Sequence, residues 1–293
     1  WTKWLATMVI LTVLCASLHA QIIYVGQVGS DKIGEYDATT GAVINANFIV
    51  GLNDPWGLVL SGNNLFVANC ASGTIGKYGA TTGAVINANF ITALDGPSGL
   101  ALTGNSLFVA NYDGNMVGQY NAITGAAINA NFITGLYGAW GLALSGNNLF
   151  VANGGSGGSV GQYNATTGAA INASFITGLN SPIALALSGT HLFVANYSSG
   201  TVGEYNATTG AVINANFITG LNYPYGLALS GNNLFVTNTG SSAVSEYNAS
   251  TGAAINANFI TGLSFPNGLA VTPAPTPKPT PTPIPGPIAA PRS

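Results

Sequence analysis

The stretch GLALSGNNLFVAN at residues 141–153 decides the fold, because close copies of it recur along most of the chain. The first glycine of the stretch marks each copy, and successive markers are 42, 42, 43, 42 and 42 residues apart. The marker positions are Gly57, Gly99, Gly141, Ala184, Gly226 and Gly268. A fixed period between about 20 and 50 residues is typical of proteins built from stacked repeats.

Each copy contains four short runs that favour β-strands. Between residues 225 and 260 they are YGLALS, NLFVTN, AVSEYN and AAINANFI. Runs of this length, rich in Val, Ile, Phe and Tyr and bounded by Gly, Asn and Ser, favour strands over helices. Two turn signals separate them, SGNN (145–148) and NATTG (206–210), the second with a glycine suited to the left-handed region. Four antiparallel strands per repeat of about 42 residues indicate a β-propeller blade.

The two ends of the repeat region complement each other. The run IIYVGQ (22–27) matches NLFVAN, so the first unit lacks its innermost strand, whereas PNGLAV (266–271) supplies an innermost strand and stops. Pairing that C-terminal strand with the three N-terminal strands removes two exposed sheet edges. We therefore predict an all-β, six-bladed β-propeller over residues 21–272, closed by this pairing.

Both ends of the chain differ from the repeats. Residues 1–20 have one lysine, an apolar run and small residues up to Ala20, which is typical of a signal peptide. Residues 273–293 are proline-rich and predict an extended linker or tail. We expect a secreted, cell-surface or periplasmic protein with no stable membrane span after signal removal, in which Cys70 is the one remaining cysteine.

The amino-acid sequence of the repeats resembles that of a known protein family. NYPYGLALSGNNLFVTNTGSSAVSEYNASTGAAI (222–255) is similar to tandem NHL repeats, whose pattern is Pro-x-Gly-Leu-Ala-Val, a glycine hairpin and then Leu-Phe-Val-Ala-Asp. The resemblance covers residues 22–271 and implies a propeller. Asparagine replaces the aspartate of that pattern, and the stretch SGTIG or SGTVG replaces its frequent basic stretch.

The charge content excludes several functions. Only 4% of the residues are charged, and Lys32 and Lys77 are the two positive charges in the propeller region. Nucleic acid binding needs clustered Lys and Arg, so we predict no nucleic acid partner. The mature chain holds one histidine, His191, expected on the face opposite the variable loops, and no metal-ligand or cofactor motif. We therefore predict no metal and no cofactor.

A set of amides repeats with the blades and has two interpretations. The set is Gln27, Asn69, Asn111, Asn153, Asn196 and Asn238. It could form a collar of amide oxygens around a central channel and hold a cation or a ligand hydroxyl. Alternatively, each asparagine could fix a loop by bonding backbone amides.

Two loops change in every copy and carry the large aromatic residues. One runs into the innermost strand and the other follows the repeated asparagine, so both are expected on one face. They hold the candidate ligand-binding residues Trp56, Tyr112, Tyr137, Trp140, Tyr197, Tyr223 and Tyr225, together with Phe265. Because their positions suggest that Trp56 and Trp140 are about a third of the ring apart, we expect a ligand touching both to span the channel mouth.

Aromatic rings with little charge suit a neutral glycan first and an uncharged peptide or protein segment second. We expect a non-catalytic exported binding or adhesion module. A propeller-type lyase or hydrolase and a structural envelope or matrix protein remain as alternatives. The outermost strands, such as 211–218, carry no charge, which predicts weak self-association through their edges.

Overall fold

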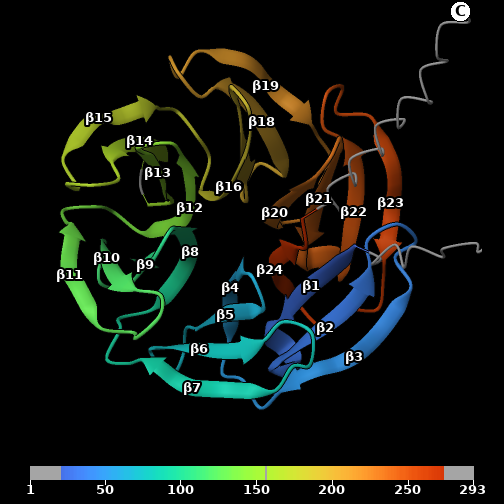
Figure 1. The fold of residues 1–293 in the computed structure, drawn as a ribbon. Helices are drawn as coiled ribbons and strands as arrows, with labels where there is room; N and C mark the ends of the chain where they lie inside the picture. Colours follow the sequence, from blue (N-terminus) through green and yellow to red (C-terminus); the bar gives the residue numbers. More distant parts are fainter. Residues whose placement is uncertain (1–20, 156, 274–293) are drawn as a thin grey trace, which may run out of the picture.

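The computed structural model describes residues 21–155 and 157–273, which form a closed ring of six four-stranded antiparallel sheets (Figure 1). The predicted signal peptide and nearly all of the predicted proline-rich tail lie outside these ranges. The predicted all-β, six-bladed propeller is confirmed.

Five blades are continuous in sequence, and each runs from an innermost to an outermost strand. They are β4 (Pro55–Ser61), β5 (Asn64–Asn69), β6 (Thr74–Gly79) and β7 (Val85–Ile91); β8 (Pro97–Thr103), β9 (Ser106–Asn111), β10 (Met116–Asn121) and β11 (Ala127–Ile133); β12 (Ala139–Ser145), β13 (Asn148–Asn153), β14 (Ser159–Asn164) and β15 (Ala170–Ile176); β16 (Pro182–Ser188), β17 (His191–Asn196), β18 (Thr201–Asn206) and β19 (Val212–Ile218); and β20 (Pro224–Ser230), β21 (Asn233–Asn238), β22 (Ala243–Asn248) and β23 (Ala254–Ile260).

The sixth blade closes the ring with strands from both ends of the described chain. Its order is β24 (Pro266–Val271), β1 (Ile22–Gln27), β2 (Lys32–Asp37) and β3 (Val43–Val50). The antiparallel register aligns Ile23 with Val271 and Val25 with Leu269. The predicted closure is therefore confirmed. Short 3-10 turns, η1 (Val28–Ser30) and η2 (Thr239–Ser241), follow β1 and β21.

The near-constant turns have the geometry that their residues favour. In the NATTG turn, the Asn206 side-chain oxygen accepts the backbone N–H groups of Thr208 and Thr209, both at 2.9 Å. Gly210 follows at φ 73°, in the left-handed region that a side chain would strain. The turn also packs on the neighbouring blade, since a Cβ on Gly210 would lie 2.3 Å from the carbonyl oxygen of Phe175. These local bonds and this close contact explain why the turn barely changes between blades.

The hydrophobic core is divided into six clusters, and each cluster is shared by two adjacent blades. Between β8–β11 and β12–β15, for example, Phe108 and Val117 of one blade pack with Leu149 and Val151 of the next, all fully buried. The cluster between the closing blade and β20–β23 contains Ile23, Val25, Phe235 and Leu269. No blade encloses a core of its own, so closure buries the last two faces.

The outermost strands carry a bulge that their sequence explains. In β7 the side-chain oxygen of Asn87 accepts the backbone N–H of Asn89 at 3.0 Å, and the register against β6 shifts at this point. The same bond recurs at the matching position of all six blades. Bulges hinder pairing between exposed edges, while isoleucines such as Ile86 stay about half exposed there. Self-association through these edges stays a prediction.

The closure predicts that the last strand stabilises the whole ring. A chain ending at Phe265 loses β24, exposes one side of β1 and removes Leu269 from its core. Two or three buried aliphatic side chains contribute about 5 kcal/mol, so we expect the melting temperature to fall by roughly 10–20 °C. A chain ending at Pro273 is the control, since it retains β24. Equal melting temperatures for the two chains, measured by calorimetry, would refute the closure.

The third strand of the closing blade buries a carboxylic acid, Glu35, which is 7% exposed. Burial raises the pKa of Glu35 above its ordinary value. Glutamine occupies the matching position in two other blades, at Gln119 and Gln162. The protein therefore tolerates an uncharged amide at this position.

We predict that Glu35→Gln stabilises the protein at neutral pH. The unfolded chain ionises this group near pH 4.3, whereas the folded chain holds the proton to higher pH. Between the two pKa values the native state binds more protons, so stability falls as pH rises through that window. Thermal unfolding should show the variant more stable at pH 7 and equal to wild type below about pH 4. A gain that is the same at every pH would contradict this account.

Candidate ligand-binding site

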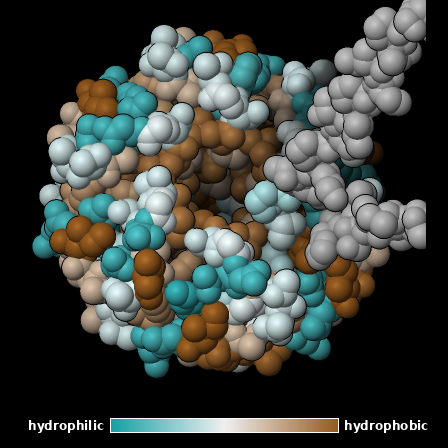
Figure 2. Space-filling view, in the orientation of Figure 1, coloured by the Kyte–Doolittle hydropathy of each residue, from teal (hydrophilic) through white to brown (hydrophobic). Residues whose placement is uncertain are grey.

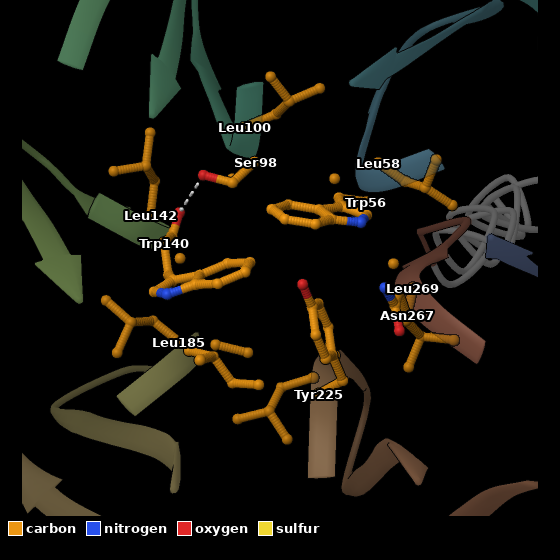
Figure 3. Close-up of a pocket in the computed structure, with 18 residues that line it drawn as sticks. Trp56, Leu58, Ser98, Leu100, Trp140, Leu142, Leu185, Tyr225, Asn267 and Leu269 are labelled. Atoms are coloured by element: carbon orange, nitrogen blue, oxygen red, sulfur yellow. Dashed lines mark hydrogen bonds between the residues drawn. The ribbon is translucent and has the colours of Figure 1, made fainter. Parts of the chain in front are cut away.

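The six residues that precede the marker positions line one mouth of the channel together. Figure 3 shows the side chains of Trp56, Trp140 and Tyr225 pointing inward over it. Large and smaller side chains alternate around this mouth ring: Trp56, Ser98, Trp140, Ile183, Tyr225 and Asn267. The alternation lets three aromatic rings fit over a narrow channel. In the sequence these six residues stand at the end of the variable loops, and the ring was not predicted. Their fixed position directly before each marker residue is a signal that could have predicted it.

The marker glycines let the blades approach each other closely below this ring. A Cβ on Gly99 would lie 2.1 Å from the carbonyl oxygen of Trp140, and one on Gly268 would lie 2.1 Å from that of Trp56. Neither glycine has a positive φ, so the requirement here is space between neighbouring backbones. The glycine repeated in the sequence therefore positions the mouth ring.

The indoles of Trp56 and Trp140 stack on each other with their centroids 4.7 Å apart and an angle of 27° between their planes. Tyr112 packs against Trp140 at 4.4 Å, and Tyr225 meets Trp140 edge-on at 5.6 Å. The two tryptophans belong to blades a third of the ring apart, as expected. Both side chains reach inward and meet over the channel, so the expectation that a ligand touching both must span the channel mouth was wrong.

A basin of about 500 Å³ lies against this aromatic cluster. It is lined by five of the predicted aromatic residues and by Phe265, together with residues from the loops around them: Val28, Asp54, Trp56, Tyr112, Trp140, Gly154, Ser181, Ile183, Tyr197, Ser198, Tyr225, Thr239, Phe265 and Asn267. The variable loops thus meet on one face, as the sequence indicated.

Two of the predicted residues are not part of the basin lining. Tyr137 is 64% exposed and lines a separate side pocket with Asn153 and Gly155. Tyr223 stacks on Tyr197 at 4.9 Å and is half exposed. Tyr137 lies three positions before Trp140, and Tyr223 lies two positions before Tyr225. Both side chains therefore turn toward solvent, whereas the mouth-ring side chains turn inward.

The hydroxyl of Tyr225 is buried and has no hydrogen-bond partner among the described residues. It points toward the space between the two indoles, as Figure 3 shows. Burial above all raises the pKa of this phenol well beyond its ordinary value. A buried hydroxyl without a partner costs about 1–3 kcal/mol. Because most buried polar groups are paired, this hydroxyl is a candidate contact for a ligand.

The electrostatic environment of the basin is acidic. The carboxylate of Asp31 accepts the backbone N–H of Asp54 at 2.9 Å. Burial and Asp31 raise the pKa of Asp54, while a hydrogen bond from the Trp56 side chain lowers it. Burial, with Asp54 and Asp113, raises the pKa of Cys70 to about 12. The Cys70 thiol is therefore protonated at neutral pH and unreactive.

The predicted collar of amides around the channel is not present. Gln27 and the five asparagines end the second strands rather than the innermost ones, so innermost strands separate them from the channel. The Nδ2 group of Asn111 donates to the carbonyl of Val109 at 3.2 Å, two residues back on its own strand. Four of the amide oxygens are buried without a partner among the described residues: Asn111, Asn153, Asn196 and Asn238. The set therefore lies within the blades.

The opposite mouth of the channel is aliphatic. Its cavity of about 380 Å³ is lined by four repeats of Leu-Ala-Leu, at residues 100–102, 142–144, 185–187 and 227–229. Figure 2 shows hydrophobic residues around the hollow at the centre of the ring. His191 begins β17 at the end remote from the basin, as the sequence indicated, and contacts Glu204 at 2.7 Å. The two mouths therefore differ sharply in chemistry.

The comparisons with known proteins support the fold. A chain of the crystal structure of a nidogen/laminin complex matches with a TM-score of 0.75 at 15% identity, over 86% of this chain and 98% of that chain. The computationally designed Ika8 protein matches with a TM-score of 0.54 at 16% identity, over 84% and 74% of the two chains. Identities this low show that the chain is a β-propeller and nothing finer. No family model and no curated protein matches the sequence.

Within residues 21–155 and 157–273, no helix is long and apolar enough to cross a membrane. No group of three or more His, Cys, Asp and Glu side chains there could hold a metal ion.

The unpaired hydroxyl predicts that Tyr225→Phe stabilises the ligand-free protein. Removing a buried group without a partner should raise the free energy of unfolding by about 1 kcal/mol, or roughly 2–4 °C in melting temperature. Tyr24→Phe is the matched control, because the fully buried Tyr24 hydroxyl donates to the carbonyl of Ala80 and its loss should destabilise. A destabilised Tyr225→Phe variant would mean that the hydroxyl has a structural partner.

Proposed function

We propose that the protein is an exported, non-catalytic binding or adhesion module whose aromatic basin takes a glycan, with a peptide segment as the second candidate. The observation that carries this proposal is the convergence of six aromatic side chains and a buried, unpaired hydroxyl on one cavity of about 500 Å³. Ligand pockets of about 300–1,000 Å³ combine an apolar lining with a few placed polar groups. The basin has this composition.

The chemistry of the basin favours a sugar. Trp56, Trp140 and Tyr112 are each partly exposed, so ring surface is available for stacking on a pyranose face. Hydroxyl groups line the same cavity: Ser198 donates to Ser181 at 2.9 Å, and Thr239 donates to the carbonyl of Pro266 at 2.9 Å. Sugar hydroxyls exchange hydrogen bonds readily with such groups.

Binding as the general role is also supported by fold similarity. A propeller of similar structure occurs in the nidogen/laminin complex, so a six-bladed ring of this kind takes part in a protein complex there. That precedent supports a binding module and keeps a peptide or protein ligand as the second candidate. The sequence of the repeats supports descent from NHL-like propellers. The signal-peptide pattern of residues 1–20 supports export to a secreted, cell-surface or periplasmic location.

The test is glycan binding followed by tryptophan fluorescence. The protein should carry Trp1→Phe and Trp4→Phe, so that the signal comes from Trp56 and Trp140 in the basin. A binding oligosaccharide should change that emission, and Trp56→Ala with Trp140→Ala should weaken binding measured by calorimetry at least tenfold, or about 1.4 kcal/mol.

Tyr137→Ala is the control, because this exposed tyrosine lies on the same face outside the basin. It should leave affinity unchanged. Full affinity in the double tryptophan variant would show that the ligand binds elsewhere, and the absence of binding to any glycan or peptide of a broad panel would overturn the proposal.

A further inference from the structure

Four of the eight acidic residues lie in the loops of the basin face. Asp31 precedes β2, Asp54 precedes β4, Asp95 lies between β7 and β8, and Asp113 lies between β9 and β10. Asp31 and Asp54 contact each other through a hydrogen bond, and a Cβ on Gly96 would touch the Asp113 carboxylate. The Cys70 thiol experiences the charges of both Asp54 and Asp113. These four carboxylates are the acidic rim of this face, and Asp54 is the one among them that lines the basin beside the aromatic cluster.

No positive side chain of the described residues balances this rim. The basin lining contains Asp54 and no Lys, Arg or His. Lys32 donates to Asn47 on the outermost strand of its blade, and Lys77 lies over Phe66 and Phe90. His191 contacts Glu204 at the opposite mouth, remote from the rim. The basin thus has a negative potential that its own fold leaves without compensation.

The groups that face the basin are acceptors suited to a cation that donates hydrogen bonds. The carboxylate of Asp54 can accept from an ammonium group, and so can the unpaired oxygen of Tyr225. The faces of Trp56, Trp140 and Tyr112 attract a positive charge through their quadrupoles. Charge-assisted hydrogen bonds of this kind are about twice as strong as neutral ones.

We infer that the ligand is a glycan with free amino groups, such as an oligomer of glucosamine, whose ammonium group binds between Asp54 and the aromatic rings. This inference rests on the proposed glycan-binding function and names its substrate class. An amino sugar replaces the neutral sugar that was expected from the low overall charge. The overall charge does not show that half of the acidic residues lie on one face. A free ammonium group gives the acidic rim a partner, and an acetylated amine does not.

The experiment compares two probes that differ only in charge, a glucosamine hexamer and its fully N-acetylated counterpart. Both are titrated into the full chain by calorimetry, at a pH where the sugar amines are protonated and the aspartates ionised. The glucosamine hexamer should bind at least about tenfold more tightly. Added salt should weaken that preference, since exposed charges are screened.

Matched variants separate the rim from the overall charge of the protein. Asp54→Asn with Asp113→Asn should remove most of the preference for the amine, because affinity for the glucosamine hexamer should fall further than affinity for the acetylated hexamer. Asp37→Asn is the control, because it removes one charge at the far end of β2 and installs the residue that four other blades carry in this turn, for example Asn206. It should leave the preference intact.

The outcomes also separate this inference from the proposed function. Equal affinity for the two hexamers, or tighter binding of the acetylated one, would overturn the ammonium assignment and leave glycan binding in place. Binding of neither hexamer would overturn this inference, including the case in which a lysine-rich peptide binds instead. The proposed function would be overturned only if the broad panel of glycans and peptides also failed to bind. A preference for the amine that survives loss of Asp54 and Asp113 would also overturn the inference.

Discussion

The structure depends on hydrophobic cores that lie between blades. Each of the six clusters takes residues from two neighbours, so a single blade has no interior and cannot bury its apolar faces alone. An open row of blades would expose one face at each end. The pairing of β24 with β1 removes both faces at once and joins the C-terminal strand to the N-terminal sheet. Most of the repeated sequence serves this constraint.

A second constraint acts at the axis, where the innermost strands approach each other through the marker glycines. The carbonyl of one mouth-ring residue lies against the glycine of the preceding blade, as at Gly99 and Trp140. This close approach brings the ring residues within reach of one another. Their alternating sizes then let Trp56, Trp140 and Tyr225 cover the channel, so the scaffold and the candidate site share one physical cause.

The two mouths of the channel are lined by different kinds of side chain. One carries the aromatic cluster, the unpaired Tyr225 hydroxyl and the acidic rim, and the other is lined by leucine and alanine. The buried Tyr225 hydroxyl has no partner among the described residues, and burial raises the pKa of Asp54. Both features lower stability, and groups that cost stability tend to be kept at functional sites. The two groups line one cavity together with the aromatic cluster, and this combination marks the aromatic mouth as the candidate site.

The sequence by itself determined the fold, the number of blades, the closure and the face on which the variable loops meet. Period, strand-forming runs and glycine turns are local properties, and each is repeated often enough to be read without a structure. It also found five aromatic residues of the basin. It could not place side chains about the axis, so it did not bring Trp56 and Trp140 into contact and it included Tyr137 and Tyr223. It also left a channel collar open as one of two interpretations of the amides. Only the tertiary structure decided these points, because the direction of a side chain and the gathering of Asp31, Asp54, Asp95 and Asp113 on one rim depend on how distant blades are brought together.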